Sequence, residues 1–110
     1  MHTLDLLRSG ALIGTHRLDL NGAGLTHLPP EVYGLADTLE VLNLSDNQLT
    51  SLPPDLPRLH RLKVIFCSGN PFTHLPEVLG DCPVLEMVGF KACRLQHVPA
   101  AALPPALRWL

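Results

Sequence analysis

Apolar residues recur along this chain at a nearly constant spacing. When the chain is aligned on Leu18, Leu42, Ile65 and Val88, successive marks lie 24, 23 and 23 residues apart, and Leu110 follows after 22 more. Apolar and polar residues alternate around each mark, which predicts a short strand that buries every second side chain. Spacing on this scale indicates repeats that each contribute one strand.

The residues that follow each strand repeat as well. An asparagine or a cysteine stands at the same distance after the last three strands, as Asn47, Asn70 and Cys93. We expect this side chain to lie where the backbone leaves the sheet and to hydrogen-bond backbone groups that would otherwise be buried unpaired. Repeat one has Ala23 at this position, and it is therefore expected to be held less firmly.

A Leu-Pro or Val-Pro pair begins the return segment of every repeat. These pairs are Leu28-Pro29, Leu52-Pro53, Leu75-Pro76 and Val98-Pro99. Proline fixes φ and lacks a backbone donor, so a long helix cannot run through these positions. We expect turns, short helices or 3₁₀ turns in the return segments.

The blocks resemble the leucine-rich-repeat family, whose pattern is L-x-x-L-x-L-x-x-N/C-x-L. The resemblance covers residues 15–110, as about four repeats and the start of a fifth. It implies an α/β fold: a right-handed solenoid with parallel strands on the concave face and irregular or short-helical segments on the convex side. Residues 1–14 are predicted to form an N-terminal cap whose short helix ends at Gly10.

The C-terminal residues 107–110 match the opening of a fifth strand, and no C-terminal cap is predicted. Two interpretations are open: the array continues in a longer protein, or another chain covers this edge. An uncovered edge strand beside exposed apolar side chains favours association. Self-association through this edge is therefore one expectation.

The outward strand positions form columns that are expected to line the concave face. The first column contains Arg17, Val41, Val64, Met87 and Trp109; the second contains Asp19, Asn43, Phe66 and Gly89; the third contains Asn21, Ser45, Ser68 and Lys91. Apolar side chains on a surface that faces water indicate an interaction site. The predicted partner-binding residues are Val41, Val64, Phe66, Met87, Trp109 and Lys91. The alternative for the two valines is that they only stabilise the strands.

Two further columns carry polar groups. Charges alternate in sign from Glu40 onward in the column His16, Glu40, Lys63, Glu86 and Arg108, which predicts cross-strand ion pairs that oppose slipped stacking. Another column contains His27, His74 and His97. Two stacked imidazoles can bind a metal ion, but no carboxylate or cysteine recurs beside them, and we predict no metal site.

Composition restricts the class of partner and the compartment. A net charge of −2 and a pI near 6.3 predict no nucleic-acid or membrane binding. Cys67 and Cys82 are expected to be buried, and Cys93 takes the asparagine position, so no cysteine needs a disulfide or a metal. Without an export signal, we expect a cytoplasmic protein.

No catalytic motif is found, and Gly22 and Gly24 do not open a helix after a strand as a dinucleotide site requires. We therefore predict a non-catalytic protein–protein interaction module without a cofactor. A second resemblance rests on Leu6-Leu7-Arg8-Ser9-Gly10, Arg17-Leu18-Asp19-Leu20 and Leu103-Pro104-Pro105-Ala106-Leu107-Arg108-Trp109-Leu110. With these stretches the chain resembles the N-terminal arrays of bacterial leucine-rich-repeat proteins that carry a kinase-like domain. The first alternative is therefore a recognition segment of such a longer protein. A secreted bacterial effector is the second, although such arrays use a repeat of roughly 20 residues.

Overall fold

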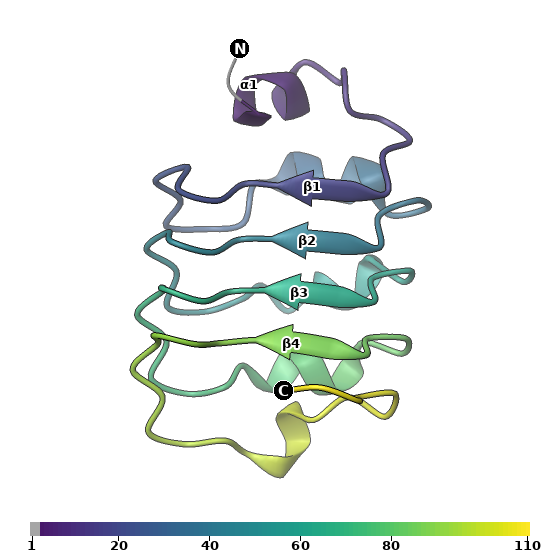
Figure 1. The fold of residues 1–110 in the computed structure, drawn as a ribbon. Helices are drawn as coiled ribbons and strands as arrows, with labels where there is room; N and C mark the ends of the chain where they lie inside the picture. The colour runs from purple at the N-terminus through teal and green to yellow at the C-terminus, as the bar shows by residue number, and fades with distance from the viewer. Residues whose placement is uncertain (1–2) are drawn as a thin grey trace.

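The computed structural model describes residues 3–110 and shows one coil of repeats (Figure 1). In chain order, its elements are α1 (Thr3–Arg8), β1 (Arg17–Asp19), η1 (Pro30–Leu35), β2 (Val41–Asn43), η2 (Leu56–Arg58), β3 (Val64–Phe66), η3 (Glu77–Asp81), β4 (Met87–Gly89) and η4 (Ala100–Ala102), where η denotes a 3₁₀ helix. The strands form one parallel sheet in the order β1-β2-β3-β4. The coil is right-handed, and the return segments lie behind the sheet, as predicted.

The strand register follows the repeat spacing residue by residue. Leu18 pairs with Leu42, Leu42 with Ile65, and Ile65 with Val88. All four of these side chains are buried. The predicted columns of the strands are therefore confirmed, because parallel pairing places equivalent residues of successive repeats side by side.

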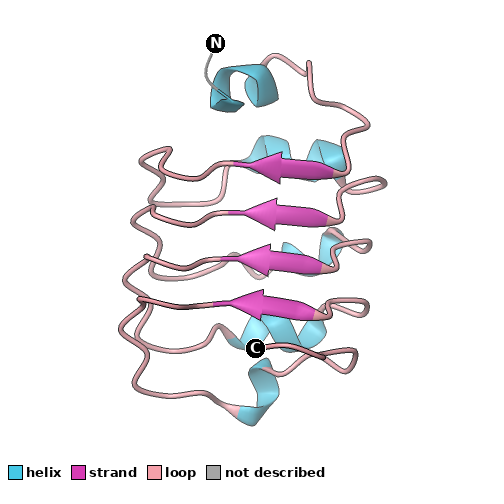
Figure 2. Cartoon of the chain, viewed as in Figure 1, coloured by secondary structure: helices cyan, strands magenta, loops and turns pink. Residues whose placement is uncertain are grey.

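The return segments contain only 3₁₀ helices of three to six residues, which confirms the prediction from the Leu-Pro pairs (Figure 2). Pro29, Pro76 and Pro99 each precede such a helix in an extended conformation, with ψ between 126° and 141°. An extended residue at this point redirects the chain across the back of the sheet. The short helices then return it to the start of the next strand.

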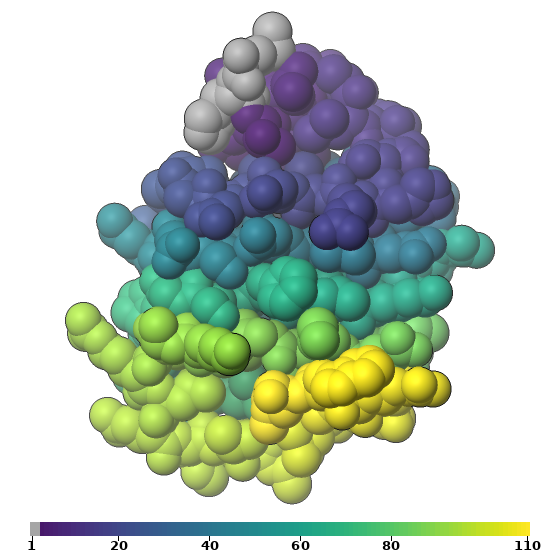
Figure 3. Space-filling view, viewed as in Figure 1, coloured from purple at the N-terminus to yellow at the C-terminus, as the bar shows by residue number. Residues whose placement is uncertain are grey.

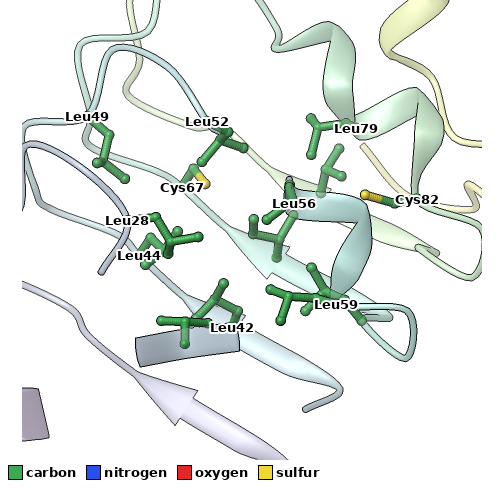
Figure 4. Close-up of a cluster of buried hydrophobic side chains, with 14 of the residues drawn as sticks. Leu28, Leu42, Leu44, Leu49, Leu52, Leu56, Leu59, Cys67, Leu79 and Cys82 are labelled. Carbon is green, nitrogen blue, oxygen red and sulfur yellow. The ribbon is translucent and has the colours of Figure 1, made fainter. Parts of the chain in front are cut away.

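The core lies between the sheet and these return segments (Figure 4). Strand residues such as Leu42 and return-segment residues such as Leu56 and Leu59 are at most 1% exposed. Burying a leucine side chain contributes roughly 1.5–3 kcal/mol. Cys67 and Cys82 belong to the same core, as predicted, and all three cysteines are free.

Asn47 and Asn70 are the buried polar residues of the described chain, and both satisfy backbone groups as predicted. The Asn47 side-chain oxygen accepts hydrogen bonds from the N–H groups of Ala23 and Leu25, both at 3.0 Å. Its amide donates to the carbonyls of Leu20 and Leu44 at 3.0 and 2.9 Å. Repeat two thus supplies the polar side chain that Ala23 lacks in repeat one.

Asn70 repeats this arrangement one turn further along. Its side-chain oxygen accepts from the Leu49 N–H at 3.0 Å, and its amide donates to the carbonyls of Leu44 and Cys67, both at 2.9 Å. Cys93, at the same position of repeat four, donates its thiol to the Cys67 carbonyl at 3.3 Å. A thiol is a weak donor with one proton, so repeat four is tied more weakly than repeats two and three.

The N-terminal helix packs on the first repeat. Leu7 of α1 is 4% exposed and joins the core. Gly10 ends the helix with φ of +82°, and bonds from the N–H groups of Gly10 and Ala11 to the carbonyls of Leu7 and Leu6 complete a Schellman motif. The predicted cap, residues 1–14, begins with two residues that lie outside the described range.

The C-terminal segment pairs with β4 at one point only. Met87 and Trp109 form an isolated parallel bridge, and the N–H groups of Arg108 and Trp109 donate to the Glu86 carbonyl. The repeat spacing predicts a buried side chain at Leu110, and that prediction is wrong, since Leu110 is 68% exposed. A single bridge does not continue as a strand, and no residue of the described chain covers Leu110.

Candidate protein-binding surface

The outward side chains of the strands form one surface, which we call the strand face. Val41, Val64 and Met87 lie side by side in the register of β2, β3 and β4, and each is half-buried. Trp109 extends this column through its bridge to Met87 and is 55% exposed. The column is thus a continuous apolar strip from β2 to the C-terminal segment.

The structure brings four of the six predicted residues together around one hollow. Phe66, Met87, Lys91 and Trp109 line a space of about 560 Å³, which we call the C-terminal hollow. Figure 3 shows it between the yellow C-terminal segment and the yellow-green loop that follows β4. These residues come from β3, β4, the loop after β4 and the bridged segment, so the hollow needs repeats three and four together with the C-terminal segment.

The two valines lie elsewhere on the strand face. Val41 lines a smaller hollow of about 160 Å³, together with Arg17, Asp19 and Phe66. Val64 lines neither hollow. The N-terminal part of the strand face is therefore polar and carries charges of both signs, while its C-terminal part is apolar.

Sequence reasoning missed several residues of the C-terminal hollow. They are Ser68, Val88, Gly89, Phe90, Leu95, Val98 and Leu110. The sequence held a signal for Gly89, because it is the one glycine in the three outward columns and so marks a position without a side chain. Val98 has a core position in the repeat pattern but is 45% exposed, because no residue of the described chain covers it as repeat four covers Leu75.

Of the three ion pairs predicted from Glu40 onward, one forms within residues 3–110, and Glu40 also contacts His16. Glu40 lies 3.5 Å from His16 and 3.9 Å from Lys63. Neither Lys63 with Glu86 nor Glu86 with Arg108 forms an ion pair within residues 3–110. The backbone nevertheless stays in register here, since the Glu86 N–H donates to the Lys63 carbonyl at 2.8 Å. The expectation of a fully paired column is therefore wrong for its C-terminal half.

The histidine column is formed as the spacing predicts. His74 and His97 are bridged, and their ring centroids lie 5.8 Å apart at an interplanar angle of 68°. Nδ1 of His74 lies 2.9 Å from the Thr73 hydroxyl. The described residues contain no group of three or more His, Cys, Asp or Glu side chains that could hold a metal ion.

Burial makes two of the three thiols poor nucleophiles. It raises the pKa of Cys67 far above its ordinary value, and Cys93 nearby adds to this shift. Burial also raises the pKa of Cys82 to about 11, with a further contribution from Asp81. A thiol of high pKa holds little thiolate, the reactive form, at neutral pH.

Comparison with known proteins supports the repeat assignment directly. A family model described as leucine-rich repeats in two copies matches residues 37–77. A probable inactive serine/threonine-protein kinase of Dictyostelium discoideum, roco10, is 32% identical over 86% of this chain. The mouse transforming growth factor beta activator LRRC32 is 38% identical over 68% of it. The chain spans only 4% and 12% of these two relatives.

Solved structures share the fold. The leucine-rich-repeat domain of the type III effector XopL superimposes on 89% of the chain with a TM-score of 0.73 and 22% identity. A leucine-rich-repeat protein of Leptospira interrogans covers 97% of it with a TM-score of 0.62, also at 22% identity. The chain covers 33% of each of these two structures, and identities this low establish the fold alone.

No helix within residues 3–110 is long and apolar enough to cross a membrane.

The repeat pattern extends over all four strands, and the family model, the sequence relatives and the structural neighbours agree on its type. This chain belongs to the leucine-rich-repeat proteins.

Proposed function

We propose that this chain is a protein–protein interaction module that binds its partner on the strand face. The observation that carries the proposal is the clustering of Phe66, Met87 and Trp109 around one hollow of that face. A contiguous exposed apolar patch marks an interaction site more often than a chance surface. Leucine-rich-repeat proteins are typically interaction modules, which supports the same conclusion.

The backbone beneath this face is held in place before any partner arrives. Asn70, below the face, fixes the turn after β3, and Phe90 packs edge-on against Phe72 with ring centroids 5.2 Å apart. A rigid surface loses little conformational freedom on binding, so more of its contact energy appears as affinity. The apolar strip thus suits a folded or extended protein partner.

The test is capture from the source cells with wild-type chain and with the double variant Phe66→Asp, Met87→Asp. Two buried carboxylates at the interface should abolish capture of the partner, because their desolvation is not compensated. Arg61→Asp, an exposed charge change away from the strand face, is the matched control and should capture normally. Urea unfolding of all three chains excludes a folding defect. Normal capture by the folded double variant would move the site off the strand face.

Any catalysis is proposed to lie outside these residues. Leucine-rich-repeat folds are typically non-catalytic, and several relatives are kinases or kinase-like proteins of which the chain spans at most 4%. We therefore add a second candidate: the chain is the recognition segment of a larger, kinase-containing protein. An antibody raised to repeats two and three would detect a native band far above 12.0 kDa in this case, and a band near 12.0 kDa would contradict it.

We also propose a bacterial cytoplasm as the site of action, because the three free thiols need no oxidising compartment. Fractionation of the source cells tests this, and recovery of the chain from the medium would favour the effector alternative.

Self-association through the edge at Trp109 is proposed as a subsidiary property. Light scattering should then give a dimer for wild type and a monomer for Trp109→Glu, whereas equal masses would contradict it.

A further inference from the structure

Gly89 in β4 leaves space for a neighbouring side chain, and it does not serve an unusual backbone conformation. Its backbone is not in the left-handed region, and any residue could adopt its strand conformation. A Cβ at this position would lie 3.0 Å from Cδ1 of Phe66 and 3.7 Å from its Cε1. The Phe66 ring therefore leans from β3 over the neighbouring strand and occupies the room that a side chain at position 89 would take. Glycine inside a strand often marks such a close approach.

The space next to this contact is the C-terminal hollow. Its floor is formed by Val88, Gly89 and Phe90, and its volume of about 560 Å³ lies within the roughly 300–1,000 Å³ of typical ligand sites. Val98, Trp109 and Leu110 at its rim are 45%, 55% and 68% exposed. Half of the exposed large apolar side chains of the described chain thus surround this one hollow, which favours an apolar occupant.

One charged side chain stands at the rim, and it defines the occupant further. Lys91 is the one charged side chain among the residues that line the hollow, and no acidic side chain lines it. None of the ion pairs found within residues 3–110 includes Lys91. Its backbone N–H donates to the Ser68 hydroxyl at 3.1 Å, which fixes the position from which the ammonium extends. An unpaired ammonium beside an apolar floor attracts a carboxylate.

We propose that the C-terminal hollow binds a segment of a partner protein that inserts a large apolar side chain over Gly89, against Phe66, and places a carboxylate at Lys91. This inference rests on the proposed function of the strand face and names the chemistry of its partner. The N-terminal part of the face fits such a segment less well, because Arg17 and Asp19 already bring both charges to its smaller hollow.

The experiment is selection from a phage library of random peptides on the immobilised 110-residue chain. Enriched peptides should combine an aromatic or large aliphatic residue with Asp or Glu one or two positions away. A fluorescein-labelled copy of the most enriched peptide should bind at least tenfold more weakly to Lys91→Glu, which reverses the charge, and to Gly89→Val, which fills the floor. Asn21→Glu places the same new side chain in the same column, far from the hollow, and should leave binding within twofold.

Several outcomes would overturn this proposal, and they separate it from the broader one. Binding that Val64→Asp weakens but Lys91→Glu and Gly89→Val do not would keep the strand face as the site and reject the hollow. Selection without enriched peptides, or with peptides insensitive to every one of these variants, would reject both. Peptide binding that weakens as the chain concentration, and with it the fraction of dimer, rises would assign the hollow to a second copy. Lys91 is exposed, so Lys91→Glu should fold normally. Its result therefore stands even if Gly89→Val fails to fold.

Discussion

Repeats two and three differ from repeat four in how the chain is tied where it leaves the sheet. Asn47 and Asn70 are 6% and 2% exposed and bridge backbone groups of neighbouring repeats with both ends of the amide. Cys93 is half-buried and makes one weak bond to the Cys67 carbonyl. The stack is therefore firmest in its middle, whereas the apolar hollow lies on its more weakly tied end. The hollow thus joins the firmly tied repeat three, which supplies Phe66, to the weakly tied repeat four.

The largest effect should come from removing one of the asparagines. Asn70→Ala leaves the Leu49 N–H buried without this partner, while the carbonyls of Leu44 and Cys67 lose one donor each and keep those from Asn47 and Cys93. An unpaired buried group costs roughly 1–3 kcal/mol and each lost hydrogen bond about 0.5–1.5 kcal/mol, so we expect a loss of about 3 kcal/mol in the free energy of unfolding. Urea denaturation measures it, and the exposed Asn21→Ala should change stability by less than about 0.5 kcal/mol. An equally small effect at Asn70 would remove the contrast between the repeats.

Repeat four is also held through its return segment, because η4 packs against Gly80 in the return segment of repeat three. A Cβ at Gly80 in η3 would collide with the Ala101 carbonyl in η4. Overpacking of this kind costs roughly 1–3 kcal/mol, and we expect Gly80→Ala to lose about 2 kcal/mol by displacing η4. Gly34→Ala in η1 is the matched control, because its Cβ would find only ordinary contact with Ile13. Thermal unfolding of both variants would decide whether η3 and η4 pack this closely in solution.

Cys93→Asn should strengthen the weak turn. By analogy with Asn70, the new amide would donate to the carbonyls of Cys67 and Phe90 and accept from the Phe72 N–H, which occupy the equivalent positions. We expect a gain of about 1 kcal/mol, the usual net value of a hydrogen bond, while Cys93→Ala should lose a smaller amount. Urea midpoints of the three chains test this. A destabilised asparagine variant would mean that repeat four has no room for the amide.

The smallest effect is expected in the charged column. Glu40→Gln removes the ion pairs with His16 and Lys63, whose side chains are 66% and 52% exposed. Exposed pairs contribute little because water and salt screen them, so we expect a loss of at most about 0.5 kcal/mol that vanishes at high salt. Unfolding in about 0.1 M and about 1 M salt, between which the Debye length falls from about 10 Å to about 3 Å, measures it. A loss comparable to that of Asn70→Ala would show that charge pairing, not the buried amides, sets the register.

The sequence allowed the columns of the strand face to be predicted, because parallel pairing converts a constant spacing into spatial neighbours. Val41, Val64 and Met87 are adjacent for that reason alone. The roles of Asn47 and Asn70 were also predictable, since a buried turn needs polar side chains of that length at that point.

The hollow itself was not predictable in the same way. Periodicity says that Phe66 points outward, but not that its ring leans over Gly89. Nor does it indicate that Arg58 lies 4.5 Å from the ring centre of Tyr33, because return segments built around proline have no regular period to follow. Leu110 and Val98 departed from the pattern because their exposure depends on what packs against them, which a repeat motif does not specify.

The constant step between strands has a consequence for how this surface can change over evolutionary time. Copying one internal repeat, such as residues 41–63, would insert a strand of the same register and lengthen the face by about 4.8 Å. All three existing strand pairs would be preserved, including Phe66 with Gly89, and one new pair between the two copies of β2 would be added. A single duplication could therefore move the charged N-terminal part of the face away from the apolar hollow and adapt the chain to a longer partner, leaving the pocket chemistry intact.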